Sequence, residues 1–155
     1  MSFPVIAVTV GDPSGIGPEV AVKAARDPRV VAVCRPQLYG PYGADELAEF
    51  PAGEISADSA RGAYDAIVRA VEDARRGRVA AIATAPVNKE AFAAAGLKWR
   101  GHTDLLAHLC GVDDVAMLFW SDRLRVVLAT VHIPLADVPR ALTGERLLAV
   151  IRLTA

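Results

Sequence analysis

The polar side chains that could do chemistry gather in one stretch of the sequence, residues 84–135. This stretch holds all three histidines of the chain, His102, His108 and His132. Two of them, His102 and His132, lie where a predicted strand or loop gives way to a new element, which is where α/β proteins place binding groups. The sequence therefore indicates that a binding or catalytic site lies in this stretch.

The segment Gly101-His102-Thr103 is suited to bind an anion. Glycine lets the backbone approach a ligand closely, and the histidine and the hydroxyl follow at the start of a predicted helix. Free N–H groups at such a helix start favour negative charge. We therefore predict that this segment binds a phosphate. His108, which follows within the same apolar helix, is interpreted as a packed or surface histidine.

His132 ends a β-branched predicted strand and is followed closely by Pro134. Histidine is a common metal ligand, but a metal site usually needs three or four protein ligands. Neither a His-x₃-His nor a Cys-x₂-Cys spacing occurs here. Spacing alone leaves a structural histidine and a metal ligand both open, and a metal site would need ligands from elsewhere.

Two further polar groups follow predicted strands. Lys89 comes just past the strand that ends at Thr84, at the edge where open α/β sheets bind ligands. It could meet a phosphate or a carboxylate, or it could be a solvated helix lysine. Asp12 lies in the glycine-rich turn 11–19, which can expose N–H groups but fits neither the Gly-x-x-x-x-Gly-Lys nor the Gly-x-Gly-x-x-Gly template. A tight strand-to-helix turn is the alternative for that segment.

The elements that must position these residues predict an α/β fold. Short apolar runs that end at glycine or polar residues indicate buried strands, and apolar residues at helical spacing indicate helices. Before the polar stretch we expect strands at 4–10, 30–33 and 79–84, helices at 18–26 and 56–76, and a mostly irregular segment 35–53 with a short helix near 44–49. Within and after it we expect helices at 87–95, 103–110, 135–142 and 145–153, and a hairpin of strands 115–120 and 124–131.

Local signals support several of these ends. Ser56 and Thr143 are expected to cap the helices that follow them, and Thr103 is a possible cap for the next helix. Gly77 is expected to end the long helix.

Length and composition narrow the class of protein. A chain of 155 residues has the length of one domain, and 53% hydrophobic residues with a mean hydropathy of +0.31 suit helices packed on both faces of a sheet. A net charge of −1 gives no broad attraction to nucleic acid or to an anionic membrane. Two unpatterned cysteines, no signal peptide and no apolar run of about 20 residues predict a cytoplasmic protein with reduced thiols.

Four motifs, in order along the chain, resemble those of the 4-hydroxythreonine-4-phosphate dehydrogenase (PdxA) family of vitamin B6 biosynthesis. They are Val-Thr-Val-Gly-Asp-Pro-Ser-Gly-Ile-Gly-Pro-Glu (8–19), Thr-Ala-Pro-Val-Asn-Lys-Glu (84–90), Gly-His-Thr-Asp (101–104) and Leu-Arg-Val-Val-Leu-Ala-Thr-Val-His-Ile-Pro-Leu (124–135).

The resemblance implies a three-layer α/β/α fold like that of isocitrate and isopropylmalate dehydrogenases, with a mostly parallel sheet and an antiparallel hairpin. It makes residues 1–155 a single α/β region equivalent to the N-terminal half of the family's chain. It also implies a homodimer that uses NAD or NADP and a divalent metal (zinc, magnesium or cobalt). The implied reaction is oxidation, with decarboxylation, of 4-phosphohydroxy-L-threonine on the path to pyridoxal phosphate.

By motif match, the resemblance makes His102 and Thr103 substrate-binding residues. His132 corresponds to one of three histidines that hold the metal at the subunit interface. Asp12 and Lys89 are expected as further contacts at the ligand edge, and no residue is assigned a catalytic role.

The chain also departs from the family pattern. Family members are much longer, and their later half carries the other two metal histidines, a substrate lysine and arginine, and most of the nucleotide site. The connection between Val33 and Gly53 looks short, Asp104 replaces the usual glutamate, and Val131 replaces a usual threonine. We therefore expect an incomplete fold with an exposed apolar face, which would dimerise or aggregate and be inactive alone.

These departures leave other functions open. One is a dehydrogenase of another phosphorylated hydroxy acid, such as threonate or erythronate 4-phosphate. The others are a truncated non-catalytic remnant and a phosphate-binding or regulatory module.

Overall fold

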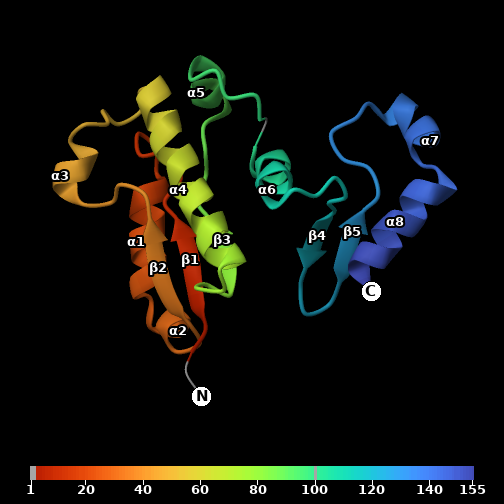
Figure 1. The fold of residues 1–155 in the computed structure, drawn as a ribbon, viewed down its shortest axis with the longest axis horizontal. Helices are drawn as coiled ribbons and strands as arrows, with labels where there is room; N and C mark the ends of the chain where they lie inside the picture. The colour runs from red at the N-terminus through yellow and green to blue at the C-terminus, as the bar shows by residue number, and fades with distance from the viewer. Residues whose placement is uncertain (1–2, 100) are drawn as a thin grey trace. The chain divides into compact units, whose positions relative to one another are not determined.

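Three parallel strands organise the first part of the chain in the computed structural model, which describes residues 3–99 and 101–155 (Figure 1). The strands are β1 (Val5–Thr9), β2 (Arg35–Tyr39) and β3 (Ala81–Thr84), in the order β2-β1-β3. Val8 of β1 is in register with Leu38 of β2 and with Ala83 of β3. The apolar sequence of β1 suits this central place, because a central parallel strand is covered on both faces.

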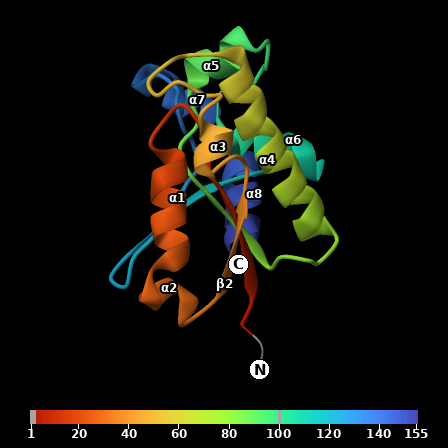
Figure 2. The same cartoon turned by 90° about the vertical axis from the view of Figure 1, so that its left-hand side faces the viewer.

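Helices α1 (Gly17–Arg26) and α4 (Ala57–Arg75) lie on opposite sides of these strands, as Figure 2 shows. The chain runs from β1 through α1 to β2, and then from β2 through α4 to β3 on the other side of β1. Because crossovers between parallel strands are right-handed, opposite directions of travel put the two helices on opposite faces. The first part of the chain therefore has the three α/β/α layers that we predicted.

Helix α4 contributes more buried residues than any other described element. Its start is fixed by Ser56, whose side chain accepts a hydrogen bond from the Ser59 N–H at 3.0 Å, as the sequence predicted. Its buried face is mainly alanine, and such small side chains let the helix approach the sheet closely. The buried residues of this face are Ser59, Ala60, Ala63, Ala66, Ile67, Ala70 and Val71.

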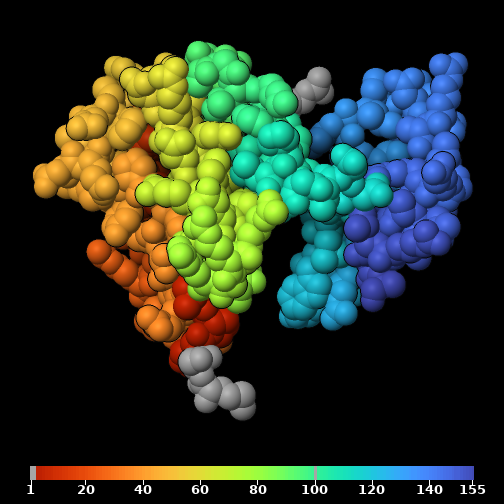
Figure 3. Space-filling view, in the orientation of Figure 1, coloured from red at the N-terminus to blue at the C-terminus, as the bar shows by residue number. Residues whose placement is uncertain are grey.

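The chain divides into two compact units, Met1–Leu105 and Leu106–Ala155. The first unit also contains the short helices α2 (Pro28–Val31), α3 (Ala44–Leu47) and α5 (Lys89–Ala94), and α6 (His102–Cys110) begins in it. Figure 3 draws the surface of the described residues in colour. No helix in the described ranges combines the length and apolar character that crossing a membrane requires.

The second unit contains the predicted hairpin and the predicted last helix. The hairpin pairs β4 (Met117–Trp120) with β5 (Arg125–Leu128), and the helices are η1 (Leu135–Asp137), α7 (Val138–Ala141) and α8 (Gly144–Thr154). Thr143 caps α8 by accepting a hydrogen bond from the Arg146 N–H at 3.1 Å. The Arg146 guanidinium in turn donates to the carbonyl oxygens of Ala129 and Val115, both at 3.2 Å, so α8 is tied to the ends of both strands.

Little apolar surface is covered within the second unit. Val150 is its one buried residue, judged over Leu106–Ala155, all of which the structure describes. Leu118 and Trp120 lie on one face of the hairpin and Phe119 on the other, yet their exposed fractions are 55%, 61% and 55%. An isolated two-stranded hairpin is marginal in water. The predicted exposed apolar face is therefore present, and it lies in this unit.

The predicted strand at 30–33 is wrong. Pro28–Val31 forms α2 instead, because the Asp27 carboxylate caps it by accepting from the Arg29 N–H at 2.8 Å. The second strand is β2, within a segment that the sequence indicated as mostly irregular. Pro36 is tolerated there because Arg35 and Tyr39 bond β1, which leaves the intervening Pro36 on the free edge of the strand.

Three other boundaries differ from the predictions. The second hairpin strand is four residues long, not 124–131. The predicted helix 135–142 is divided into the short helices η1 and α7. Thr103 does not cap α6, because the helix already begins at His102 and the Asp104 carboxylate accepts from the Gly101 N–H at 3.0 Å.

Two glycines allow the turn after β1 to pack tightly at the ligand edge of the sheet. Gly11 has φ +73°, and a Cβ there would lie 2.1 Å from the Pro86 carbonyl oxygen in the segment after β3. The next residue, Asp12, donates its N–H to that same oxygen at 2.9 Å. A Cβ on Gly17 would lie 2.1 Å from the Val10 carbonyl oxygen. Only glycine fits either position without a backbone shift.

We predict that Gly11→Ala lowers the free energy of unfolding by more than about 2 kcal/mol, because backbone strain and a steric clash act together. Gly77→Ala is the matched control: Gly77 has φ +69°, but nothing lies within 4 Å of a Cβ there. Strain alone should cost about 1 kcal/mol in that control. Denaturant unfolding of both variants measures the difference. If both variants lose the same free energy of unfolding, the turn after β1 is not in close steric contact with Pro86.

Candidate functional site

Several of the predicted site residues come together in the first unit, beyond the carboxyl end of β3. The Asn88 side chain accepts hydrogen bonds from the N–H groups of Glu90 and Ala91 at 2.9 and 3.1 Å, so it caps α5. Lys89 is the first residue of α5, and its Cε lies 4.0 Å from where a Cβ on Gly101 would be. The structure therefore places the Lys89 side chain beside the residue that precedes α6.

The start of α6 provides a positive helix end at this place. The Gly101 N–H is taken by the Asp104 carboxylate, and the Leu105 N–H donates to the Gly101 carbonyl oxygen at 3.4 Å. Thr103 is exposed in the first turn, with its hydroxyl on the same short segment as His102. The first turn of a helix favours an anion because its N–H groups lack partners within the helix.

His102 is half-buried, and its Nε2 atom is buried without a hydrogen-bond partner among the described residues. Burial lowers the pKa of His102 below its ordinary value of 6.5, because the charged imidazolium is the form that loses hydration. The ring is therefore neutral at neutral pH. A buried polar atom without a partner is uncommon in a folded protein, so the Nε2 atom is available to bond a polar ligand atom.

Lys89 is exposed, and within residues 3–99 and 101–155 its ammonium has neither an ion pair nor a hydrogen bond. Other cations of the unit, such as Lys23 and Arg78, are engaged with carboxylates. A free cation, a hydroxyl and a helix N-terminus together suit a phosphate, which is best bound by charge-assisted hydrogen bonds.

Asp12 has a structural role in the observed contacts. Its side chain is buried and accepts a hydrogen bond from the Ser14 N–H at 2.9 Å, and its carbonyl oxygen accepts from the Gly15 N–H at 3.0 Å. The carboxylate thus closes the turn between β1 and α1. The hydroxyls of Thr9 and Ser14, near this turn in sequence, are buried without partners among the described residues. Neither hydroxyl was predicted as a site residue from the sequence.

His132 lies in the second unit, where it is exposed. Its φ of +57° makes it the one described residue other than glycine with a positive φ. Such a backbone is strained for histidine, and strain of this kind is concentrated at functional sites. Nowhere in the described ranges do three or more His, Cys, Asp or Glu side chains form a group that could hold a metal. His132 is therefore a single candidate ligand, and these residues do not complete a metal site.

An aromatic stack that was not predicted from the sequence lies three residues before His102 in the chain. The rings of Tyr64 on α4 and Trp99 are stacked, with centroids 5.3 Å apart and an interplanar angle of 19°. The Lys98 ammonium lies 5.6 Å from the Trp99 ring centroid. The two residues are 35 positions apart in the sequence, so no local pattern predicts that they stack.

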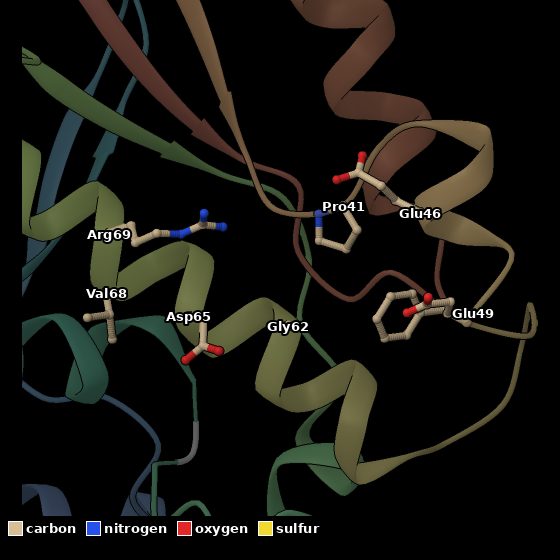
Figure 4. A pocket seen from close by; sticks show the side chains of 8 residues that line it. Pro41, Glu46, Glu49, Gly62, Asp65, Val68 and Arg69 are labelled. Atoms are coloured by element: carbon tan, nitrogen blue, oxygen red, sulfur yellow. The ribbon is translucent and has the colours of Figure 1, made fainter.

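The hollows on the α4 side of the first unit are separate from these residues. One, of about 590 Å³, lies between α3 and α4, and Figure 4 shows Asp65 and Arg69 of α4 on one side and Glu46 and Glu49 on the other. The Glu46 carboxylate is already engaged, since it accepts from the N–H groups of Gly43 and Tyr42. None of the predicted site residues is among those that line this hollow.

The neighbouring hollow, of about 650 Å³, is lined by groups that bond one another. The Tyr39 hydroxyl donates to the Asp73 carboxylate at 2.7 Å, and Arg78 donates to the same carboxylate at 3.0 Å. Burial, and then this contact with Asp73, raises the pKa of Tyr39 to about 12. Because these groups satisfy each other, they have a structural role, and the cluster at Lys89 and His102 is the better candidate for a ligand.

Comparison with known proteins identifies relatives along most of the chain. The family described as "Pyridoxal phosphate biosynthetic protein PdxA" matches residues 17–155. A 4-hydroxythreonine-4-phosphate dehydrogenase of Desulforapulum autotrophicum is 36% identical over 189 residues, which cover 98% of this chain and 56% of that protein. A D-threonate 4-phosphate dehydrogenase of Cupriavidus necator is 37% identical over 174 residues, covering 89% and 52%.

A solved structure has the same fold. The crystal structure of a 4-hydroxythreonine-4-phosphate dehydrogenase from Burkholderia phymatum superposes with a TM-score of 0.87 at 35% identity, covering 98% of this chain and 57% of that one. The chain spans about half the length of the relatives that it matches. The 189-residue match also exceeds the 155 residues of this chain, so the relative has residues inside the matched region that this chain lacks.

We predict that His132→Gly raises the free energy of unfolding by about 0.5–1 kcal/mol relative to His132→Ala, because only glycine adopts a positive φ without strain. Both substitutions remove the imidazole, so the comparison isolates the backbone. Denaturant unfolding of the two variants measures it. If alanine proves as stable as glycine, the backbone at 132 is not held in the left-handed region in solution.

Proposed function

The chain belongs to the PdxA family of pyridoxal phosphate biosynthetic proteins, and we propose that it takes part in the oxidation of a 4-phosphorylated hydroxy acid. The proposed substrate is 4-phosphohydroxy-L-threonine, oxidised and decarboxylated with NAD or NADP during pyridoxal phosphate synthesis. The names of the relatives support the reaction class. The observation that carries the proposal is the cluster of Lys89, His102 and Thr103 at the start of α6.

In this proposal the start of α6 binds the substrate phosphate. The Lys89 ammonium supplies a positive charge, the Thr103 hydroxyl a hydrogen bond, and the first turn of α6 the positive end of the helix. His102 stays neutral because burial lowers its pKa, so its Nε2 can bond a substrate oxygen without adding charge. Asp12 acts through the fold, because it closes the turn next to Pro86.

The nicotinamide cofactor would accept the hydride, and a divalent metal (zinc, magnesium or cobalt) would polarise the substrate hydroxyl. His132 is the residue of this chain that would contribute a metal ligand, with the remaining ligands from outside the described residues. The strained backbone at His132 supports a functional role for it. The cytoplasm is the proposed location.

A second candidate substrate is D-threonate 4-phosphate, or the related erythronate 4-phosphate. It is favoured by the relatives whose names specify D-threonate 4-phosphate, including one from Bradyrhizobium diazoefficiens that is 38% identical over 186 residues. Both candidate substrates carry a phosphate, which Lys89 and the start of α6 would bind equally. The threonine derivative carries an amine where threonate carries a hydroxyl, and Lys89 and the start of α6 do not distinguish these two groups.

We also propose that two copies of the chain associate through the second unit. Many of its exposed apolar residues belong to the hairpin and to α8. Between these elements a hollow of about 580 Å³ is lined by Leu118, Val127, Leu147 and Ile151. Covering such surface is favourable at about 25 cal/mol per Å² of apolar area. The nearly neutral chain offers no strong repulsion between copies. Amide exchange rates in this unit, which should fall as the protein concentration rises, measure the association.

The function is tested by calorimetric titration with 4-phosphohydroxy-L-threonine and with D-threonate 4-phosphate. We expect Lys89→Ala to weaken binding by about tenfold or more, because a hydrogen bond to a charged group contributes about 1.5–3 kcal/mol. Lys23→Ala is the control, since Lys23 is ion-paired with Glu19 on α1 and should not alter binding.

Turnover separates the remaining alternatives. Oxidation of either compound with NAD or NADP and a divalent metal supports the dehydrogenase. The compound that is turned over with the higher kcat/KM identifies the substrate. Binding without turnover supports a non-catalytic remnant or a phosphate-binding module. If neither compound binds, or if Lys23→Ala weakens binding as much as Lys89→Ala does, the phosphate site is not at Lys89.

A further inference from the structure

The segment that carries the proposed phosphate-binding residues lies between two anchors, the end of α5 and the fully buried Leu105 of α6. It follows α5, whose end is closed by the Leu97 N–H donating to the Phe92 carbonyl oxygen at 2.9 Å. Phe92 is fully buried, so this end of α5 is anchored in the core of the first unit. The next anchor along the chain is the Trp99 ring, three residues before His102.

The partner of Trp99 belongs to α4, whose buried face packs on the sheet. Tyr64 projects from α4, between the fully buried Ala63 and Ala66. Offset stacking of two aromatic rings contributes beyond the apolar area it covers and also fixes their relative orientation. The stack therefore ties the chain just before α6 to the helix that packs on the sheet.

We infer that Tyr64 is a positioning residue for the phosphate site: its ring holds Trp99, and through it the segment that presents His102 and Thr103. This inference rests on the proposed function only for the identity of the ligand. A shift of this segment would separate the start of α6 from Lys89, which lies on α5 and would stay in place. It would also expose the buried Nε2 of His102 to water.

The ring of Tyr64, and not its hydroxyl, carries this role. Among the hydrogen bonds of the described residues, none is made by the Tyr64 hydroxyl, whereas its ring stacks on Trp99. Tyr64→Phe therefore keeps the stack and Tyr64→Ala removes it. A merely structural role for Tyr64 would lower stability without changing the surroundings of His102, so the two roles can be separated.

The test has two readouts on the full chain. The first is the pKa of His102 from the pH dependence of its imidazole NMR signal, assigned with His102→Gln. The second is the calorimetric affinity for 4-phosphohydroxy-L-threonine. We expect Tyr64→Ala to return the His102 pKa toward 6.5 and to weaken binding by at least about tenfold, because small displacements of binding groups are costly. Tyr64→Phe should match the wild type in both.

Ile67→Val is the matched control for lost stability. Ile67 is fully buried on the same helix, three residues from Tyr64, and makes no part of the stack. It should lower the unfolding midpoint and leave both readouts unchanged. The inference is overturned if Tyr64→Ala leaves the His102 pKa at the wild-type value, or if Ile67→Val moves it as far. If the wild type binds no phosphorylated compound but only Tyr64→Ala moves the His102 pKa, the positioning role stands and the proposed function fails.

Discussion

The contact between Gly11 and Pro86 is the constraint on which the ligand edge of this protein depends. It brings the turn after β1 against the segment after β3, with the Asp12 N–H bonded to the Pro86 carbonyl oxygen at 2.9 Å and no room for a Cβ on Gly11. Two residues after Pro86, Asn88 caps α5, and Lys89 follows at its start. The place of the proposed phosphate ligand is thus set by backbone packing at the end of the central strand.

Helix α4 provides the second support for that edge. Its alanine face packs on the sheet, and the half-buried Tyr64 of the same helix stacks on Trp99. The start of α6 is therefore positioned by two neighbours: α5, through Lys89 beside Gly101, and α4, through Tyr64 stacked on Trp99. The second unit is different, because it buries one residue and leaves both faces of its hairpin exposed. Its exposed residues form the surface through which we propose that two copies of the chain associate.

Sequence patterns predicted the elements whose signals are local. Ser56 and Thr143 were found as caps because a capping side chain bonds an N–H three residues away. The hairpin followed from two apolar runs and a polar turn. The strand β2 was missed because Pro36 argues against a strand unless that strand is an edge, and the edge is set by tertiary structure. Val30–Val33 was misassigned because β-branched residues outweighed the Asp27-Pro28 cap.

For the candidate site, the sequence predicted residue types well and their surroundings poorly. Gly101, His102, Thr103 and Lys89 were identified from glycine, helix-start and strand-end rules, and the structure brings Lys89 beside Gly101. The stack of Tyr64 on Trp99, the burial of the His102 Nε2 atom and the backbone of His132 depend on contacts between distant segments. No periodicity or spacing rule encodes such contacts. The structural role of Asp12 likewise became visible only with its bond to the Ser14 N–H.

The central claim is that the first unit is a self-supporting scaffold for the ligand edge, whereas the second unit depends on a further surface. Native-state hydrogen exchange of the dilute 155-residue chain tests it most directly, because amides in weakly packed regions exchange through local openings. We predict that amides of β1 and α4 exchange only through global unfolding. Those of β4, β5 and α8 should exchange much faster, and slow as rising concentration promotes association. Equal protection of both units in the dilute monomer would contradict this claim.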